Sequence, residues 1–100
     1  MSAEGYHVVY SGQVQKKLKD ILRKAKNATK LKRLAQVVLA MDQRLHEDLL
    51  GLGELTGTLR SLKLLLHVGF VRPLIIDFAV HEEKKIVFVR KIEDVTSIDL

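Results

Sequence analysis

Cysteine is absent from this 100-residue chain. Its absence excludes disulfide bonds, thiol nucleophiles and cysteine-ligated zinc, and is typical of a reducing compartment. Hydrophobic runs are short: Leu64–Leu66 and Leu74–Ile76, for example, fall far below the roughly 20 residues that cross a bilayer. The first residues, Met1–Tyr6, have neither the basic start nor the apolar stretch of a secretion signal. We therefore expect a cytoplasmic protein that does not contact a membrane.

Motifs for metals and nucleotides are also missing. The four histidines are dispersed and show no H-x-x-x-H or HExxH spacing, so no metal site is expected. Gly51, Gly53 and Gly57 lie close together, but they precede an expected strand rather than a helix. They also lack the Lys-Ser or Lys-Thr that completes a phosphate-binding loop. We expect neither a metal nor a cofactor.

Acidic residues are scarce in one long stretch of the chain. The whole sequence carries 17 Lys and Arg against 12 Asp and Glu, a net charge of +5. Between Gln13 and Gln36, Asp20 is the one acidic residue among nine cations: Lys16, Lys17, Lys19, Arg23, Lys24, Lys26, Lys30, Lys32 and Arg33. The balance reverses from Asp42 to Glu54. We expect a polarised surface, whose cationic part is either a solvated helix face or a contact surface for a polyanion or an acidic protein.

Helical periodicity dominates the first half of the sequence. The β-branched and aromatic residues of His7–Tyr10 predict a short strand, and Ser11 after it is predicted to cap a helix. Apolar residues then recur at helical spacing from Val14 to Ala25, and again from Leu31 to Leu49. The segment Asn27–Thr29 breaks the pattern, and we expect Thr29 to cap the second helix. So short a linker predicts an antiparallel helical hairpin.

Strand patterns dominate the second half. Leu50–Gly57 carries three glycines and is expected to be a loop with backbone freedom. Gly69–Pro73 and His81–Lys85 read as connections. Three strands joined by short loops predict an antiparallel meander: Leu59–Val68, Leu74–Val80 and Ile86–Ile92.

Together these elements predict an α+β fold of order β-α-α-β-β-β. The expected architecture is an antiparallel sheet with the two-helix hairpin packed on one face, leaving the other face open. A chain of 100 residues accommodates one domain, with its core from Tyr6 to Ile92 and a short C-terminal tail. Leu59 and Leu65 are expected to form a small hydrophobic surface on the open face, where a partner peptide can bind.

Several segments follow one another as in a known group of toxins. They are Val8–Ser11 leading into a helix, then Gly69–Ile76, Phe78–Glu83 and Ile86–Arg90. In this order the chain resembles the RelE/ParE superfamily of bacterial toxins, often described as plasmid stabilisation proteins. The resemblance implies a toxin of a toxin–antitoxin module. It also implies a cognate antitoxin that covers the toxin with an amphipathic helix and an extended segment.

In one branch of this superfamily the toxin is a metal-independent endoribonuclease that cleaves ribosome-bound mRNA. That reaction requires cations around a pentavalent phosphate and a group that moves protons. By resemblance, the candidates are Arg72 as the main phosphate contact, assisted by Lys63 and Arg90, with His67 as the base. Strand pleating places Lys63 and His67 on one face, which we expect to be the open one. Candidate nucleic-acid contacts are Lys16, Lys19, Arg23, Arg60 and Lys91.

Other interpretations of the same residues stay open. The final segment Glu93–Leu100 is acidic, whereas ribonuclease members of the superfamily usually carry a tyrosine or histidine on a basic C-terminal segment. A ParE-like noncatalytic binder that inhibits DNA gyrase is therefore an alternative, as is a nontoxic relic that acts only in protein interactions. For Arg72 the structural alternative is an ion pair with Asp77 or Glu54. For His67 it is a half-buried strand histidine.

Overall fold

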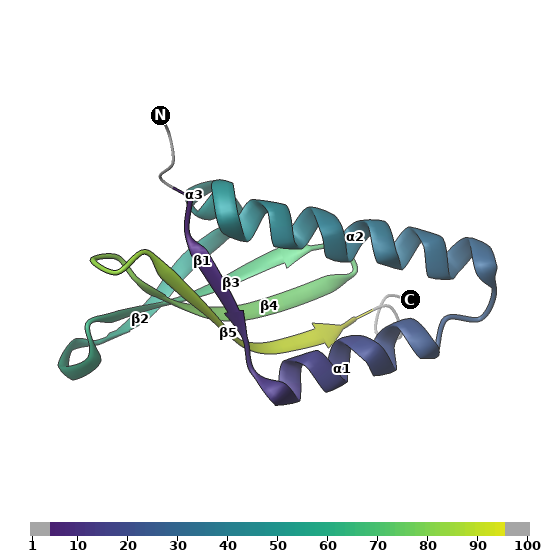
Figure 1. Ribbon diagram of the computed structural model, residues 1–100, viewed down its shortest axis with the longest axis horizontal. Coiled ribbons are helices and arrows are strands. Elements are labelled where there is room, and N and C mark those ends of the chain that lie inside the picture. Colours follow the sequence, from purple (N-terminus) through teal and green to yellow (C-terminus); the bar gives the residue numbers. More distant parts are fainter. Residues whose placement is uncertain (1–4, 96–100) are drawn as a thin grey trace.

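The computed structural model describes residues 5–95 of the chain. Strand β1 (His7–Tyr10) leads into helix α1 (Gly12–Arg23) and helix α2 (Ala28–Glu47). A single-turn helix, α3 (Leu49–Leu52), precedes strand β2 (Gly53–Leu59) and a 3-10 turn at Arg60–Leu62. The remaining strands are β3 (Leu64–Val71), β4 (Leu74–His81) and β5 (Ile86–Asp94). From the linker that joins them, the two long helices run in opposite directions, as the short linker predicts (Figure 1).

The five strands form one sheet in the order β1-β5-β4-β3-β2. Neighbours from β2 to β5 are antiparallel, whereas β1 pairs with β5 in parallel. The predicted α+β class is confirmed, but the sheet is mixed rather than antiparallel. The pairing of β1 with β5 joins the two ends of the domain, and its direction is set by the helical crossover between β1 and the rest of the sheet. The parallel direction of this pairing could not be predicted from any turn in the sequence, because β1 and β5 are not joined by one.

Side-chain caps begin both long helices. The Ser11 hydroxyl accepts a hydrogen bond from the Val14 amide at 3.1 Å, which confirms the predicted cap of α1. The second cap lies two residues earlier than expected, because Asn27 is extended and its side-chain oxygen accepts from the Lys30 amide at 2.9 Å. Asparagine is among the best capping residues, so it takes this position ahead of Thr29.

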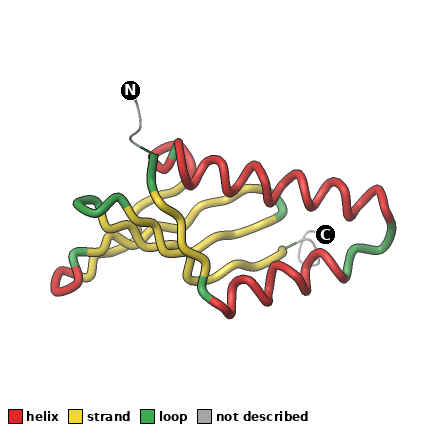
Figure 2. The backbone as a smooth tube through the Cα atoms, viewed as in Figure 1, coloured by secondary structure: helices red, strands yellow, loops and turns green. Residues whose placement is uncertain are grey.

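The hydrophobic core lies between the helices and one face of the sheet. Helix α1 contributes Val14 and Ile21, and α2 contributes Met41 and Leu45. The strands supply the rest from alternate positions: Leu74, Ile76, Phe78, Val80, Val87, Val89 and Ile92. The far end of the hairpin extends past the ends of the strands, as Figure 2 shows, and Leu31 and Leu39 of α2 are exposed.

The prediction of a loop at Leu50–Gly57 is wrong, because this segment contains most of α3 and the first five residues of β2. Among the described residues no glycine has a positive φ, so these glycines are not required for backbone freedom. Gly53 and Gly69 instead lie opposite each other in the β2–β3 ladder. A Cβ on Gly53 would be 2.8 Å from the Phe78 ring, and one on Gly69 would be 2.9 Å from the Leu52 carbonyl oxygen. Both glycines permit close packing.

The expected strand Leu59–Val68 is also corrected. Leu59 pairs with Leu64, so the intervening residues form the turn of a hairpin. Lys63 occupies this turn with a φ of 55°, in the left-handed region. The alternation of polar and apolar residues simply continues through the turn, which explains the error. Gly69–Val71, expected in a connection, belongs to β3, and the tail beyond Val95 lies outside the described residues.

Candidate functional site

The sheet face opposite the helices carries a continuous row of apolar side chains. Val9 is the neighbour of Phe88, Phe88 of Ala79, and Ala79 of Leu66, so the row crosses β1, β5, β4 and β3. Phe70 and Ile75 form a further pair on the same face. The side chains of Phe70 and Phe88 are 61% and 37% exposed. We call these six residues the open apolar face.

The two candidate cations on this face, Arg90 and Lys91, are each close to a carboxylate. An Arg90 nitrogen, Nη1, lies 3.9 Å from Asp77 Oδ1, and Lys91 Nζ lies 3.3 Å from Glu93 Oε2. The expected cluster of unpaired cations is therefore not formed there. Leu59 is exposed, but the expectation for Leu65 is wrong: it is the neighbour of Val80 and packs against the core under the helices.

Arg72 and Lys63 lie at opposite ends of β3. Arg72 occupies the β3–β4 turn, where its side chain is exposed, and Lys63 precedes the first residue of the strand. The eight residues of β3, at about 3.3 Å each, separate them by roughly 26 Å. Among the described residues Arg72 has no ion pair, and Asp77, its suggested partner, lies nearest Arg90. One phosphate cannot contact both Arg72 and Lys63.

His67 faces the helices, contrary to the expectation that it shares the open face. Its ring stacks on Phe78 with centroids 5.3 Å apart and planes at 7°. Its Nδ1 atom is buried without a hydrogen-bond partner. Burial lowers the pKa of His67, and the nearby Glu82 carboxylate opposes that effect only in part. His67 therefore occupies the half-buried strand position and lies away from Arg90.

His67→Phe is expected to leave the stability at neutral pH within about 1 kcal/mol of the parent chain, because the ring stack survives and an unpaired nitrogen is removed. The lowered pKa means that the unfolded chain binds more protons than the folded chain, so the parent loses stability as the pH falls below about 6.5. His67→Phe should reduce that acid loss. Urea denaturation at neutral and mildly acidic pH measures it, with His7→Phe on the exposed edge as the control. An unchanged acid loss contradicts the expectation.

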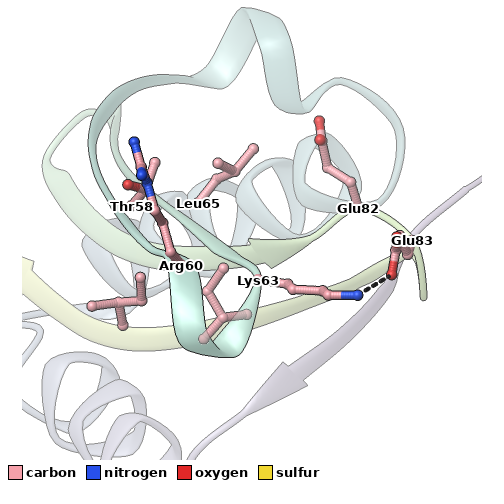
Figure 3. A pocket seen from close by; sticks show the side chains of 8 residues that line it. Thr58, Arg60, Lys63, Leu65, Glu82 and Glu83 are labelled. Carbon is pink, nitrogen blue, oxygen red and sulfur yellow. Dashed lines mark hydrogen bonds and ion pairs between the residues drawn. The ribbon is translucent and has the colours of Figure 1, made fainter.

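A pocket of about 420 Å³ lies beside the β2–β3 turn (Figure 3). Arg60 and Lys63 line one side of it, and Glu82 and Glu83 of the β4–β5 turn line the other. Lys63 Nζ lies 3.5 Å from Glu83 Oε1. The two carboxylates repel a phosphate, so this pocket is poorly suited to RNA despite its two candidate cations.

A smaller hollow of about 210 Å³ lies between α1 and β5. It brings Arg90 and Lys91, two of the candidates, beside Lys17 of α1. Lys17 was not among the nucleic-acid contacts predicted from the sequence. The signal that could have indicated it is its spacing of seven residues from Lys24, which places both lysines on one row of a helix. Glu93 also lines the hollow and pairs with Lys91.

The nine cations from Lys16 to Arg33 are all exposed. Among the described residues only Arg23 of this set has an ion pair, with Asp20 at 2.6 Å. This set includes the candidates Lys16, Lys19 and Arg23. We call it the cationic hairpin surface, and it lies on the helices, away from the open apolar face.

Tyr6 and Tyr10 both form hydrogen bonds that connect β1, or the residue before it, to α2. The Tyr10 hydroxyl donates to Asp42 Oδ1, and burial together with this contact raises the pKa of Tyr10. Asp42 Oδ2 lies 3.5 Å from His46 Nε2, and His46 Nδ1 lies 2.8 Å from the Tyr6 carbonyl oxygen. The Tyr6 amide donates to the His46 carbonyl at 3.0 Å. These tyrosines are structural and do not reach the open apolar face.

Comparisons of the chain with family models, with curated proteins and with solved structures find no match. Within residues 5–95, no helix is both long and apolar enough to span a membrane. In the same part of the chain, no group of three or more His, Cys, Asp or Glu side chains is placed to hold a metal ion.

Proposed function

We propose that this protein is a toxin of a toxin–antitoxin module, of the RelE/ParE kind, that arrests growth by binding a protein target rather than by cleaving RNA. The observation that carries the proposal is the open apolar face, on which Val9, Phe88 and Phe70 are exposed. Ala79, which lies between Phe88 and Leu66 in the row, is only 1% exposed. Exposed apolar surface of this kind marks sites of protein interaction.

The partner chemistry follows from the composition of this face. Phe70 and Phe88 are aromatic, and aromatic side chains are enriched in the buried centres of protein interfaces. The ion pairs Asp77–Arg90 and Lys91–Glu93 lie on the same face, where Asp77 separates Ala79 from Ile75 along β4. A partner segment with apolar side chains fits this arrangement. In the ParE-like mode that segment belongs to DNA gyrase, and the cognate antitoxin covers the toxin before the target does.

The dispersion of the candidate catalytic residues supports binding over cleavage. Metal-free RNA cleavage requires several cations and a base within reach of one phosphate. Here Arg72 and Lys63 lie about 26 Å apart, and His67 faces the core. Arg90 is close to a carboxylate. No two of these side chains share a phosphate-sized site within the described residues.

Induced expression in a bacterium tests the proposal. We expect colony counts to fall while ribosome-bound mRNA stays intact. Phe70→Asp combined with Phe88→Asp should relieve the arrest, because each buried aromatic anchor of an interface contributes about 2 kcal/mol, or roughly 30-fold in affinity.

Leu39→Asp is the matched control, because Leu39 is 69% exposed but lies on α2, far from the open apolar face. It should arrest growth as the parent chain does. Circular dichroism and urea denaturation verify that each variant is folded. Site-specific mRNA cleavage would instead favour the endoribonuclease, and absence of arrest by the parent chain would favour a nontoxic relic.

A further inference from the structure

The cationic hairpin surface has no part in the proposed toxin function, which uses the other side of the molecule. We infer that α1 and the start of α2 bind the phosphate backbone of double-stranded DNA without sequence preference. The inference rests on the charge, the spacing and the residue types of this surface.

The positive charge of this surface is almost unneutralised. Within residues 5–95, the acids of α2 lie at its C-terminal end, where Asp42 contacts Tyr10 and His46, and Asp48 contacts Arg44. Asp20, the one acid within the cationic stretch, pairs with Arg23. Eight exposed cations therefore lie close together with no ion pair in the described structure. A polyanion that contacts them releases its own counterions, which drives binding.

The cations of α1 lie in two rows. Lys16, Lys19 and Arg23 follow one another at intervals of three and four residues, and so share one row. Lys17 starts a second row, about 100° away around the helix, which Lys24 continues at its C-terminal cap. A helix with side chains is about 10–12 Å across, and the major groove of B-DNA is about 12 Å wide. The row of Lys16, Lys19 and Arg23 lies opposite the buried Val14 and Ile21, so it can follow one phosphate chain of the groove, whereas Lys17 lines the hollow beside β5.

The residue types point to duplex DNA and not to a single strand. No aromatic residue occurs between residues 11 and 69, so the hairpin offers no surface for stacking unpaired bases. A-form RNA has a deep, narrow major groove that does not admit a helix. Seven of the nine cations are lysines, which contact phosphates as point charges rather than reading base edges in bidentate fashion. Binding without sequence preference follows.

Fluorescence anisotropy of a labelled, random-sequence DNA duplex with the full chain tests this inference. If about four cations contact phosphates, the logarithm of the binding constant should fall against the logarithm of salt concentration with a slope of about −3.6. Affinity should then drop about a hundredfold between about 50 and 200 mM salt. The scrambled duplex should bind as tightly as the original one.

Two charge-matched variants separate local contact from net charge. Lys16→Glu, Lys19→Glu and Lys26→Glu together should weaken binding at low salt by at least about tenfold and reduce the slope to about −1. The control, Arg60→Glu, Lys63→Glu and Lys84→Glu, makes the same change in net charge at the turns far from the hairpin, and should lose much less affinity. Circular dichroism verifies that both are folded.

Four outcomes would overturn the inference: no salt-dependent binding, equal losses in both variants, tighter binding to single strands or RNA duplexes than to DNA, or binding only to an acidic polypeptide such as polyglutamate. None of these measurements depends on growth arrest, so the inference and the proposed toxin function can fail separately.

Discussion

Phe78→Ala should destabilise the protein by about 3–5 kcal/mol, the largest effect expected of any single side chain in the fold. Phe78 has no exposed surface, stacks on His67, and lies against the position where Gly53 lacks a side chain. Its removal leaves a cavity between β2, β3 and β4 that cannot collapse without moving the sheet. Because the total stability of a small domain is about 5–15 kcal/mol, a large part of it would be lost.

Urea denaturation measures this change, and Phe88→Ala is its matched control. Phe88 is the same residue type on the neighbouring strand, but it lies on the open apolar face and is partly exposed. Its truncation should change the stability by less than about 1.5 kcal/mol. Similar losses for the two variants would mean that the open face is as well packed as the core, which would contradict its assignment as a free surface.

Variants of Phe78 and Phe88 also distinguish a loss of growth arrest caused by unfolding from one caused by a lost contact. Phe78→Ala is expected to reduce arrest by lowering the amount of folded protein. A surface change at Phe88 should reduce arrest while the protein stays folded. Measuring the abundance of each variant alongside colony counts therefore shows whether a loss of toxicity has a structural cause.

The helical half of the fold could be predicted from the sequence because its signals are local. Apolar spacing defines α1 and α2, and capping residues define where they begin. The error at Thr29 arose because two good capping residues lie two positions apart, and only the backbone conformation of Asn27 decides between them.

The strands were harder to assign because their signals depend on distant partners. Apolar runs such as Leu64–Leu66 and Leu74–Ile76 do not alternate, so the sequence does not indicate which face of the sheet each residue joins. His67 was placed on the wrong face for this reason. The register also shifts at Asp77 and Phe78, which face Lys91 and Val89 and leave Arg90 without a direct partner. Such a bulge has no local sequence signal here.

The sequence predicted a cluster of cations on the open face of the sheet, whereas the structure places mainly apolar side chains there. Arg72, Lys63 and Arg90 lie on or beside strands that are neighbours in the sheet. They are nevertheless far apart in space, because they lie at different positions along the length of those strands. The row that includes Val9, Ala79 and Phe88 forms only when β1 pairs with β5. A parallel pairing between the two ends of the domain cannot be inferred from any short segment.

The second large loss of stability is expected at the glycines of the β2–β3 ladder. These glycines are needed because neighbouring atoms leave no room for a side chain, and not because their backbone conformation requires glycine. Gly69→Ala should destabilise the protein by about 1–3 kcal/mol, the usual range for an overpacked site. Its Cβ would lie 2.9 Å from the Leu52 carbonyl oxygen and 3.0 Å from Leu52 Cγ. Leu52 is buried, and its backbone belongs to α3, so the conflict is relieved only by moving that helical turn away from the sheet.

Gly57→Ala is the control, and its effect should have the opposite sign. The nearest atom to its added Cβ is Leu66 Cδ1, at an ordinary contact distance of 3.8 Å, and Gly57 has no positive φ that a side chain would strain. Alanine restricts the unfolded chain more than glycine does, so stability should rise by up to about 1 kcal/mol. Urea denaturation of the two variants checks both signs. If Gly69→Ala were as stable as Gly57→Ala, β3 and α3 would not pack as closely as described.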